Sequence, residues 1–234
     1  MIRPFTAPLA RIVAALCALT ILAACGAAPM EPGVSRELRD MYPTMEDNGW
    51  TIPAVPAQYL NDDVKRQIVT YRNDRTPGTI IVDPYSRHLF YIIDGTTAKR
   101  YTVGVGKAGR GFAGRGIINH QKDWPSWTPT QRMLKTDPEL YGPVAGGMEG
   151  GLDNPLGARA LYLYRNGRDT LYRIHGTPYP WTVGGMDSAG CIRLFQQDII
   201  DLAKITDNGT QVIVLSEAQS AEDQINRGPI GDGV

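Results

Sequence analysis

A cysteine and a histidine stand close enough in the sequence to act on one substrate. Cys191 follows His175 by 16 residues, across a loop with prolines and glycines that is long enough to fold back. A thiol is a good nucleophile only as the thiolate, and a neighbouring imidazole can take its proton and later return it to a leaving amine. These residue types at this spacing therefore indicate nucleophilic catalysis by a cysteine–histidine dyad.

The residues around Cys191 favour this chemistry. Gly190 lets the backbone turn sharply before the cysteine, because it has no Cβ. Backbone N–H groups near these two residues can then face a developing oxyanion, where one donor is typically worth about 10²–10³ in rate. Arg193 is two residues further on, so in an extended segment its side chain leaves on the same side and can hold a substrate carboxylate. An ion pair of Arg193 with Asp187 or Asp198 is the alternative.

Spacing alone leaves other roles open. Cys191 can be a buried, inert thiol that packs as a small hydrophobic residue. His88, in a predicted strand, and His120, after one, are rival bases, although packing and a loop hydrogen bond are simpler roles for them. Zinc on His175 and Cys191 would lack the third and fourth ligands that such sites use, so no metal is predicted.

The N-terminus has the layout of a secretory signal. Arg3 and Arg11 precede the apolar run 12–24, and no acidic residue accompanies them. The run has about 13 residues, whereas a helix that crosses a bilayer needs roughly 20. It ends in Leu-Ala-Ala-Cys, which resembles the bacterial lipobox and predicts a signal peptide over residues 1–24 with a lipid on Cys25. Ordinary cleavage that removes Cys25 is the alternative.

Position also decides what the three cysteines can do. Cys17 lies within the predicted signal and Cys25 is lipidated or removed, so the exported chain keeps one thiol, Cys191. Counting excludes an intramolecular disulfide, and an odd cysteine in an oxidising compartment is a liability unless its reactivity is used. By resemblance to bacterial lipoproteins, Gly26 after the lipidated cysteine favours a periplasmic protein anchored in the outer membrane rather than the inner membrane.

The composition excludes other classes of protein. The 234 residues include 24 basic and 24 acidic ones, with no basic cluster to neutralise phosphates. No nucleic-acid partner is therefore expected. The hydrophobic fraction of 42% is ordinary for a globular chain, which argues against general disorder.

Short apolar runs predict a mainly β fold in one domain. They are rich in β-branched and aromatic residues and are separated by turn residues. The predicted strands span residues 79–82, 88–93, 101–105, 117–119, 161–164, 171–174 and 212–215. One helix is predicted over 194–205, because its apolar residues gather on one face. The sequence G-x-G-x-x-G at 104–109 is followed by a strand rather than a helix, which favours flexible turns over a nucleotide-binding loop.

The flanking segments lack such patterns. Residues 25–76 contain scattered prolines and predict a lipid-anchored tether and lead-in, with one short helix near 35–41 and a short helix or extended stretch over 57–73. As flexible coil, about 30 residues would span roughly 30 Å. Residues 217–234 predict a loose C-terminal tail, which leaves 77–216 for the folded domain.

Four motifs in this order resemble one family. They are Trp124 to Pro129 (WPSWTP), Asn154 to Leu161 (NPLGARAL), His175 to Thr177 (HGT) and Ser188 to Leu194 (SAGCIRL). On an exported chain, the set resembles the bacterial L,D-transpeptidases with a YkuD-type catalytic domain, over roughly residues 77–216. The resemblance implies a β-sandwich-like arrangement of mixed sheets, with one principal helix after the catalytic cysteine.

The resemblance also implies roles for the central residues. The cysteine that matches Cys191 is the family's nucleophile, and the histidine that matches His175 is its general base and acid. The backbone carbonyl of the residue that matches Gly176 orients the imidazole.

Supporting roles follow for the neighbouring positions. Ser188 and Gly190 would support the oxyanion site, and Trp127 would border the substrate groove unless it serves in packing. Ala189 stands where many members of the family have a histidine. His175 is therefore the only local imidazole.

The implied substrate is peptidoglycan, and no metal or organic cofactor is implied. Cys191 would attack the third residue of a tetrapeptide stem, release D-alanine and pass the acyl group to an amine, which gives a 3-3 cross-link. The acceptor can instead belong to an outer-membrane protein, a free D-amino acid or water. A non-catalytic lipoprotein that binds stem peptides is the rival of another class. Contact with a membrane is expected through the N-terminal lipid.

Overall fold

The computed structural model describes residues 34–106, 112–186 and 191–227, which fall in one unit of the chain. The predicted signal peptide and Cys25 lie outside the described residues, and so do Ser188 and Gly190. The predicted site residues that the structure describes are Trp127, His175, Gly176, Cys191 and Arg193.

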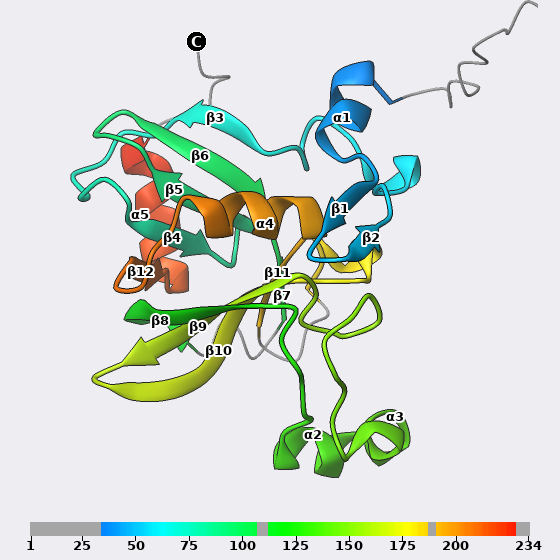
Figure 1. Ribbon diagram of the computed structural model, residues 1–234. Coiled ribbons are helices and arrows are strands. Elements are labelled where there is room, and N and C mark those ends of the chain that lie inside the picture. Colours follow the sequence, from blue (N-terminus) through cyan, green and yellow to red (C-terminus); the bar gives the residue numbers. More distant parts are fainter. Residues whose placement is uncertain (1–33, 107–111, 187–190, 228–234) are drawn as a thin grey trace, which may run out of the picture. The chain divides into compact units, whose positions relative to one another are not determined.

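A ten-stranded mixed sheet forms the body of the fold (Figure 1). In spatial order its strands are β3 (Gln67–Thr70), β6 (Thr97–Thr102), β5 (His88–Ile92), β4 (Ile80–Asp83), β12 (Gln211–Val214), β8 (Gly114–Asp123), β9 (Arg159–Arg165), β10 (Arg168–Gly176), β11 (Ile192–Leu194) and β7 (Gly104–Val105). β12 runs parallel to β4 and β10 parallel to β11, whereas the other neighbours are antiparallel. The predicted mainly β fold with mixed strands is confirmed.

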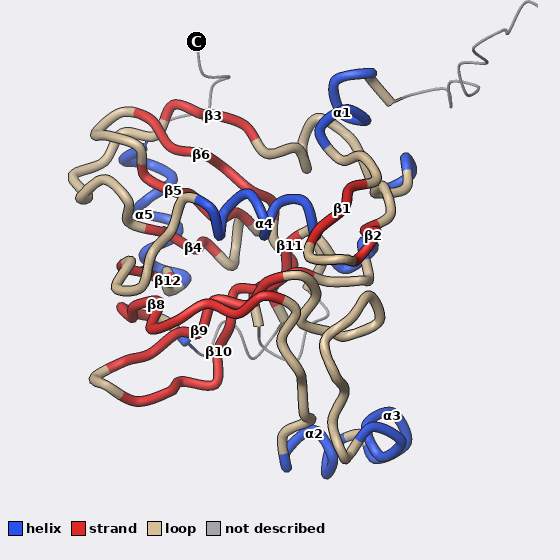
Figure 2. Tube along the Cα trace, viewed as in Figure 1, coloured by secondary structure: helices blue, strands red, loops and turns tan. Residues whose placement is uncertain are grey.

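One face of the sheet, called here the inner face, packs against α4 (Gln196–Lys204). The helix contacts β9 and β10, and the Tyr101 hydroxyl of β6 donates a hydrogen bond to Asp201 at 2.6 Å. Ile199 and Leu202 of α4 join the main apolar cluster, to which β4, β5, β9 and β10 all contribute. Figure 2 shows α4 between the β3–β6–β5 strands and the β8–β9–β10 strands. The helix predicted after Cys191 is confirmed, with narrower bounds than 194–205.

The other face, called here the outer face, carries α5 (Glu217–Arg227) over its β3–β6–β5–β4 part. Phe90 alternates with Leu89 of the inner cluster, so its ring points outward, and the Arg227 guanidinium lies 5.0 Å from the ring centre. The Tyr71 hydroxyl donates to Asp223 at 2.6 Å.

α5 corrects the expectation of a loose tail over 217–234, because 217–227 are helical and Ser220 and Arg227 are buried. A capping box begins the helix. The Gln219 N–H donates to Ser216 Oγ at 3.3 Å, and the Ser216 N–H donates to Gln219 Oε1 at 3.0 Å. The sequence S-x-x-Q at 216–219 is the signal that could have found this helix.

The N-terminal segment also differs from the predicted flexible tether. α1 (Arg36–Met41) confirms the short helix near 35–41, and Ser35 Oγ accepts its first hydrogen bond, from the Leu38 N–H at 3.2 Å. Leu38 and Tyr42 then pack with Phe195, the residue before α4. Residues 34–60 are therefore held to the domain by buried apolar side chains.

A hairpin follows α1. It consists of β1 (Met45–Asp47) and β2 (Trp50–Ile52), joined by Asn48 and Gly49 with φ of 49° and 83°. Asn-Gly is the preferred pair for such a two-residue turn, so this dipeptide was a usable sequence signal. A short 3-10 helix, η1 (Ala57–Tyr59), leads on to β3, which falls within the stretch predicted over 57–73.

The connection from β8 to β9 forms an arm. It contains α2 (Gln131–Thr136), α3 (Pro138–Tyr141) and the 3-10 helix η3 (Gly142–Val144), none of which has a buried residue. Figure 1 shows α2 and α3 below the sheet, at the end of two extended connections. In the part of the chain that the structure describes, no helix is long and apolar enough to cross a membrane.

Candidate active site

Two parallel strands bring His175 and Cys191 together. β10 pairs with β11 in the register Ile174 with Ile192 and His175 with Arg193. Because side chains alternate along a strand, Ile174 and Ile192 point into the inner apolar cluster. His175, Cys191 and Arg193 therefore belong to the outer face. Extending the register by one residue places Cys191 beside Arg173, so Cys191 and His175 are diagonal neighbours there.

His175 is held by the backbone. Its side chain is 3% exposed, and Nδ1 donates a hydrogen bond to the carbonyl of Gly176 at 2.6 Å. Burial, and then the nearby Arg193, lower the pKa of His175 to about 3, although the backbone carbonyls of Gly176 and Pro155 act in the opposite direction. The imidazole is thus neutral at pH 7, so one ring nitrogen is free to accept a proton.

A glutamine that sequence reasoning missed supports this histidine. Gln196, the first residue of α4, is buried, and its Oε1 accepts a hydrogen bond from the Ala158 N–H at 2.8 Å. A Cβ at Gly176 or at Gly157 would collide with this amide. Glycine at both positions therefore lets the strand end of His175 approach α4. The sequence signal for this role was a polar residue, Gln196, two places after the SAGCIRL motif.

Cys191 directly precedes β11 and is half-buried. Burial raises the pKa of its thiol above the usual value. The backbone N–H of Arg173, on the neighbouring strand, and the guanidinium groups of Arg173 and Arg193 act in the opposite direction. The structure therefore pairs a neutral thiol with a neutral imidazole at pH 7, and the proton must move when the sulfur attacks.

A line of side chains extends across the outer face from Cys191. Arg173 lies beside Cys191, pairs with Tyr162 of β9, and stacks over that ring at 4.2 Å. The guanidinium also binds both carboxylate oxygens of Asp169 at 2.7 Å. Tyr162 in turn stacks on His120 of β8 at 4.2 Å. The cation beside the thiol is thus fixed from two sides.

The rival histidines are placed elsewhere. His120 is three strands from Cys191, or about 14 Å at the usual strand spacing, which is too far for direct proton transfer. It lies within β8 rather than after a strand. His88 is on β5, next to Phe90, and burial lowers its pKa to about 4. Of the three histidines, His175 alone adjoins Cys191.

Arg193 shares the register position of His175, and its guanidinium lowers the pKa of both His175 and Cys191. Of its two predicted alternative partners, Asp187 lies outside the described residues. Asp198 is fully buried and accepts hydrogen bonds from Arg66 at 2.8 Å and from the Tyr42 hydroxyl at 3.2 Å.

The tryptophan motif lies where the arm joins the sheet. The Trp127 backbone forms two hydrogen bonds with Met148, at 2.8 and 2.7 Å, and its ring lies 6.2 Å from that of Tyr141. Trp124 has a φ of 41° and donates its indole N–H to Asp47 of the hairpin at 2.8 Å. A substrate-binding role for Trp127 stays a prediction.

The motif NPLGARAL holds the other connection of the arm. The Asn154 amide donates to the carbonyl of Glu149 at 2.9 Å, and its oxygen accepts from the Leu156 N–H at 2.9 Å. Arg159 binds both oxygens of Asp47 at 2.7 Å. This motif therefore fixes the loop that carries the Pro155 carbonyl to His175, a role that sequence reasoning did not assign.

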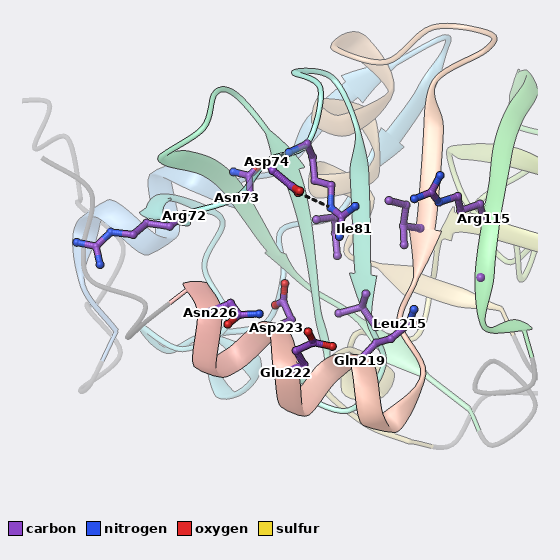
Figure 3. Close-up of a pocket in the computed structure, with 13 residues that line it drawn as sticks. Arg72, Asn73, Asp74, Ile81, Arg115, Leu215, Gln219, Glu222, Asp223 and Asn226 are labelled. Carbon is purple, nitrogen blue, oxygen red and sulfur yellow. Dashed lines mark hydrogen bonds and ion pairs between the residues drawn. The ribbon is translucent and has the colours of Figure 1, made fainter.

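A groove of about 500 Å³ lies elsewhere, against α5. Figure 3 shows Ile81 and Leu215 at its base, Glu222 and Asp223 on the helix and Arg115 on β8. Neither Cys191 nor His175 lines it. Across the described ranges, no three histidine, cysteine or acidic side chains are grouped as a metal site would need.

Comparison with known proteins adds the family. The profile of the YkuD family, described as the L,D-transpeptidase catalytic domain, matches residues 77–214, which is more than half of the chain. The chain belongs to the L,D-transpeptidase family. The match contains His175 and Cys191, whereas residues 34–76 and α5 lie outside it although they pack on the same domain.

Curated relatives agree with this assignment to the L,D-transpeptidases. The probable L,D-transpeptidase ErfK/SrfK of Escherichia coli K12 is 30% identical over 165 residues, which are 70% of this chain and 48% of the relative. The probable L,D-transpeptidase YbiS of the same organism is 29% identical over 181 residues, or 76% of this chain and 54% of the relative. The chain thus spans about half the length of the curated relatives it matches.

A solved structure from Brucella melitensis, described as a probable carnitine operon oxidoreductase caia, is 43% identical and covers 68% of this chain and 98% of its own. Its TM-score is 0.47. That description concerns the Brucella protein.

Proposed function

We propose that this L,D-transpeptidase acts on peptidoglycan stem peptides with Cys191 as the nucleophile and His175 as general base and acid. The observation that carries the proposal is that His175 on β10 and Cys191, directly before the parallel strand β11, lie on one face, with the imidazole anchored through Nδ1 to the Gly176 carbonyl. A fixed ring orientation is what proton transfer between the sulfur and the substrate requires.

The first half of the reaction forms a thioester. The thiol proton passes to the imidazole as the sulfur attacks the carbonyl carbon of the third stem residue, which gives a tetrahedral oxyanion. The C–N bond then breaks, and the imidazolium returns the proton to the departing amine of D-alanine. Backbone N–H groups near Gly190 and Cys191 would stabilise the oxyanion.

The second half transfers the acyl group. An amine of another stem attacks the thioester and gives its proton to His175, and the proton then returns to the sulfur as the thiol leaves. The product is a 3-3 cross-link, and no cofactor takes part. Arg193, beside His175 on the outer face, is the residue we assign to a substrate carboxylate.

The N-terminal sequence supports a proposal about the cellular setting. We assign the chain to the periplasm, held at the outer membrane by a lipid on Cys25, because residues 1–25 combine two basic residues, an apolar run and the sequence LAAC. Metabolic labelling with a palmitate analogue tests this directly. Label should be incorporated into the wild type and not into the Cys25→Ala variant.

Product analysis tests the function. The protein is incubated with a defined disaccharide-tetrapeptide, and products are read by mass spectrometry. A cross-linked dimer with released D-alanine supports transpeptidation between stems. Tripeptide alone would identify a carboxypeptidase, exchange of D-alanine for an added D-amino acid would identify that acceptor, and no change would contradict the enzymatic proposal.

A carbapenem identifies the nucleophile independently. The wild type should gain one covalent adduct, because the strained lactam carbonyl is open to attack by the thiolate. Cys191→Ala should gain none while it retains the thermal unfolding transition. An adduct on that variant would show that another residue reacts.

A further inference from the structure

The segment that joins His175 to Cys191 carries exposed aromatic side chains. Tyr179 is 38% and Trp181 is 59% exposed, on either side of the start of η4 (Pro180–Thr182). Their ring centres are 5.3 Å apart, and Tyr59 of η1 lies 6.5 Å from Trp181. Tyr59, Tyr179 and Trp181 form what is called here the aromatic cluster. Exposed aromatic surface next to a candidate site is typical of a ligand contact.

The polar edges of these rings have no protein partner among the described residues. The hydrogen bonds of Tyr179 run through its backbone N–H and carbonyl, and none reaches its hydroxyl, the Tyr59 hydroxyl or the Trp181 indole N–H. The cluster thus offers apolar ring faces together with uncharged hydrogen-bonding edges. A sugar ring matches this combination, because it has an apolar C–H face bordered by hydroxyl groups.

Close backbone contact holds the cluster beside the catalytic strands. Gly104 of β7 pairs with Arg193 of β11, and a Cβ at Gly104 would collide with the Thr182 carbonyl. The Val105 N–H donates to the Gly185 carbonyl at 3.1 Å. The turn that carries Trp181 is therefore fixed to β7, the strand next to β11. The contact lies level with Arg193, two residues after Cys191.

The distances suit a stem attached to a glycan. Arg193 is about 7 Å along the strand from Cys191, and β7 is about 5 Å further across the sheet. Three stem residues in an extended conformation reach about 10 Å from the scissile carbonyl. A saccharide at the start of the stem therefore reaches the aromatic cluster when the third residue lies at the sulfur.

We propose that the aromatic cluster is a saccharide subsite, which binds the N-acetylated disaccharide that carries the donor stem. The inference rests on the proposed peptidoglycan substrate and extends it from the peptide to the glycan. Such a subsite makes the enzyme select stems that are still attached to the glycan over free peptides.

Paired substrates test the subsite. Full-length wild type, Trp181→Ala and the control Leu140→Ala are assayed with disaccharide-tetrapeptide and with the same tetrapeptide lacking sugar. Leu140 is 61% exposed and lies on the arm, so its loss matches that of Trp181 in exposure. The measured quantity is kcat/KM for disaccharide-tetrapeptide divided by kcat/KM for the sugar-free tetrapeptide. We expect this ratio to fall about five- to tenfold in Trp181→Ala and to stay unchanged in Leu140→Ala.

Direct binding separates this inference from the proposed function. The peptide-free disaccharide is titrated into Cys191→Ala with and without Trp181→Ala, and binding is followed by NMR. Binding lost with Trp181 supports the subsite even when no cross-link forms. Equal losses on both substrates, or disaccharide binding that survives Trp181→Ala, would overturn it, and carbapenem acylation of Trp181→Ala verifies that the site is folded.

Discussion

At the scale of residues, the site consists of a neutral thiol and a neutral imidazole, and the backbone fixes the orientation of the imidazole. Burial raises the pKa of Cys191 and lowers that of His175 to about 3, so neither group carries a charge at pH 7. Reactivity must then come from proton transfer during attack rather than from a stored thiolate. The pH dependence of the thiol measures this directly.

We expect alkylation of Cys191 by iodoacetamide to accelerate about tenfold per pH unit through the neutral range and to level off only above the usual thiol pKa, because the thiolate is the reacting form. The rate is followed by mass spectrometry from pH 6 to 10, with Cys191→Ser as the blank. A plateau below pH 7 would instead indicate a thiolate–imidazolium pair.

The charge of Arg173 should tune the same profile. Arg173→Gln removes a cation beside Cys191, so the pKa of the thiol should rise. Asp169→Asn removes the carboxylate that binds this guanidinium, so the pKa of the thiol should fall. Shifts in the same direction in both variants would point to a structural effect rather than to charge.

At the scale of elements, the β1–β2 hairpin fixes the loop beside the site. Asp47 binds the Arg159 guanidinium at two points and the Trp124 indole, and these partners flank the arm. The side chains of Asp47 and Arg159 are 12% and 11% exposed, so the pair is largely shielded from water. Such charged hydrogen bonds contribute more than exposed ones.

We expect Asp47→Ala to lower the free energy of unfolding by about 2 kcal/mol, because the shielded Arg159 loses its bidentate partner and keeps only the more exposed Asp123. Asp74→Ala is the matched control, since the Asp74 carboxylate is 89% exposed in its pair with Arg75 and should change the value by less than about 0.5 kcal/mol. Urea unfolding measures both, and equal losses would contradict the assigned role of the hairpin.

At the scale of the whole molecule, the stable unit extends beyond the matched family domain. β3 completes one edge of the sheet, α5 covers part of its outer face, and the N-terminal segment packs on the start of α4. Gln197 of α4 donates to the carbonyls of Pro43 and Pro53 at 2.9 and 3.1 Å. Residues 34–56 are therefore part of the fold that presents the site.

A pair of truncations tests this. A chain that begins at residue 57 loses four buried apolar side chains, Leu38, Tyr42, Ile52 and Val55, whereas one that begins at residue 34 keeps them. Burial of each is worth about 1.5–3 kcal/mol, so the shorter chain should melt more than about 10 °C below the longer one. Equal melting temperatures would show that the segment is a passive lead-in.

The sequence by itself indicated His175 and Cys191 as a candidate pair, and it determined the mainly β character and the helix after Cys191, because each depends on residues that are near one another in the chain. His175, Gly176 and Cys191 lie within one strand–loop–strand unit, and the strand runs are local patterns of apolar residues. The Asn48-Gly49 turn and the S-x-x-Q cap of α5 were equally local signals. They predict a hairpin and a helix in terminal segments that the proline content and the lack of periodicity had indicated to be a tether and a loose tail.

Only the tertiary structure decided which histidine adjoins the thiol and what the N-terminal segment does. The partners involved are distant in sequence: Tyr42 meets Phe195, and Asp47 meets Arg159. Such contacts depend on strand order and on shared burial, which no local pattern encodes. The same long-range packing sets the pKa of His175 and Cys191, because desolvation is produced by the whole fold around them.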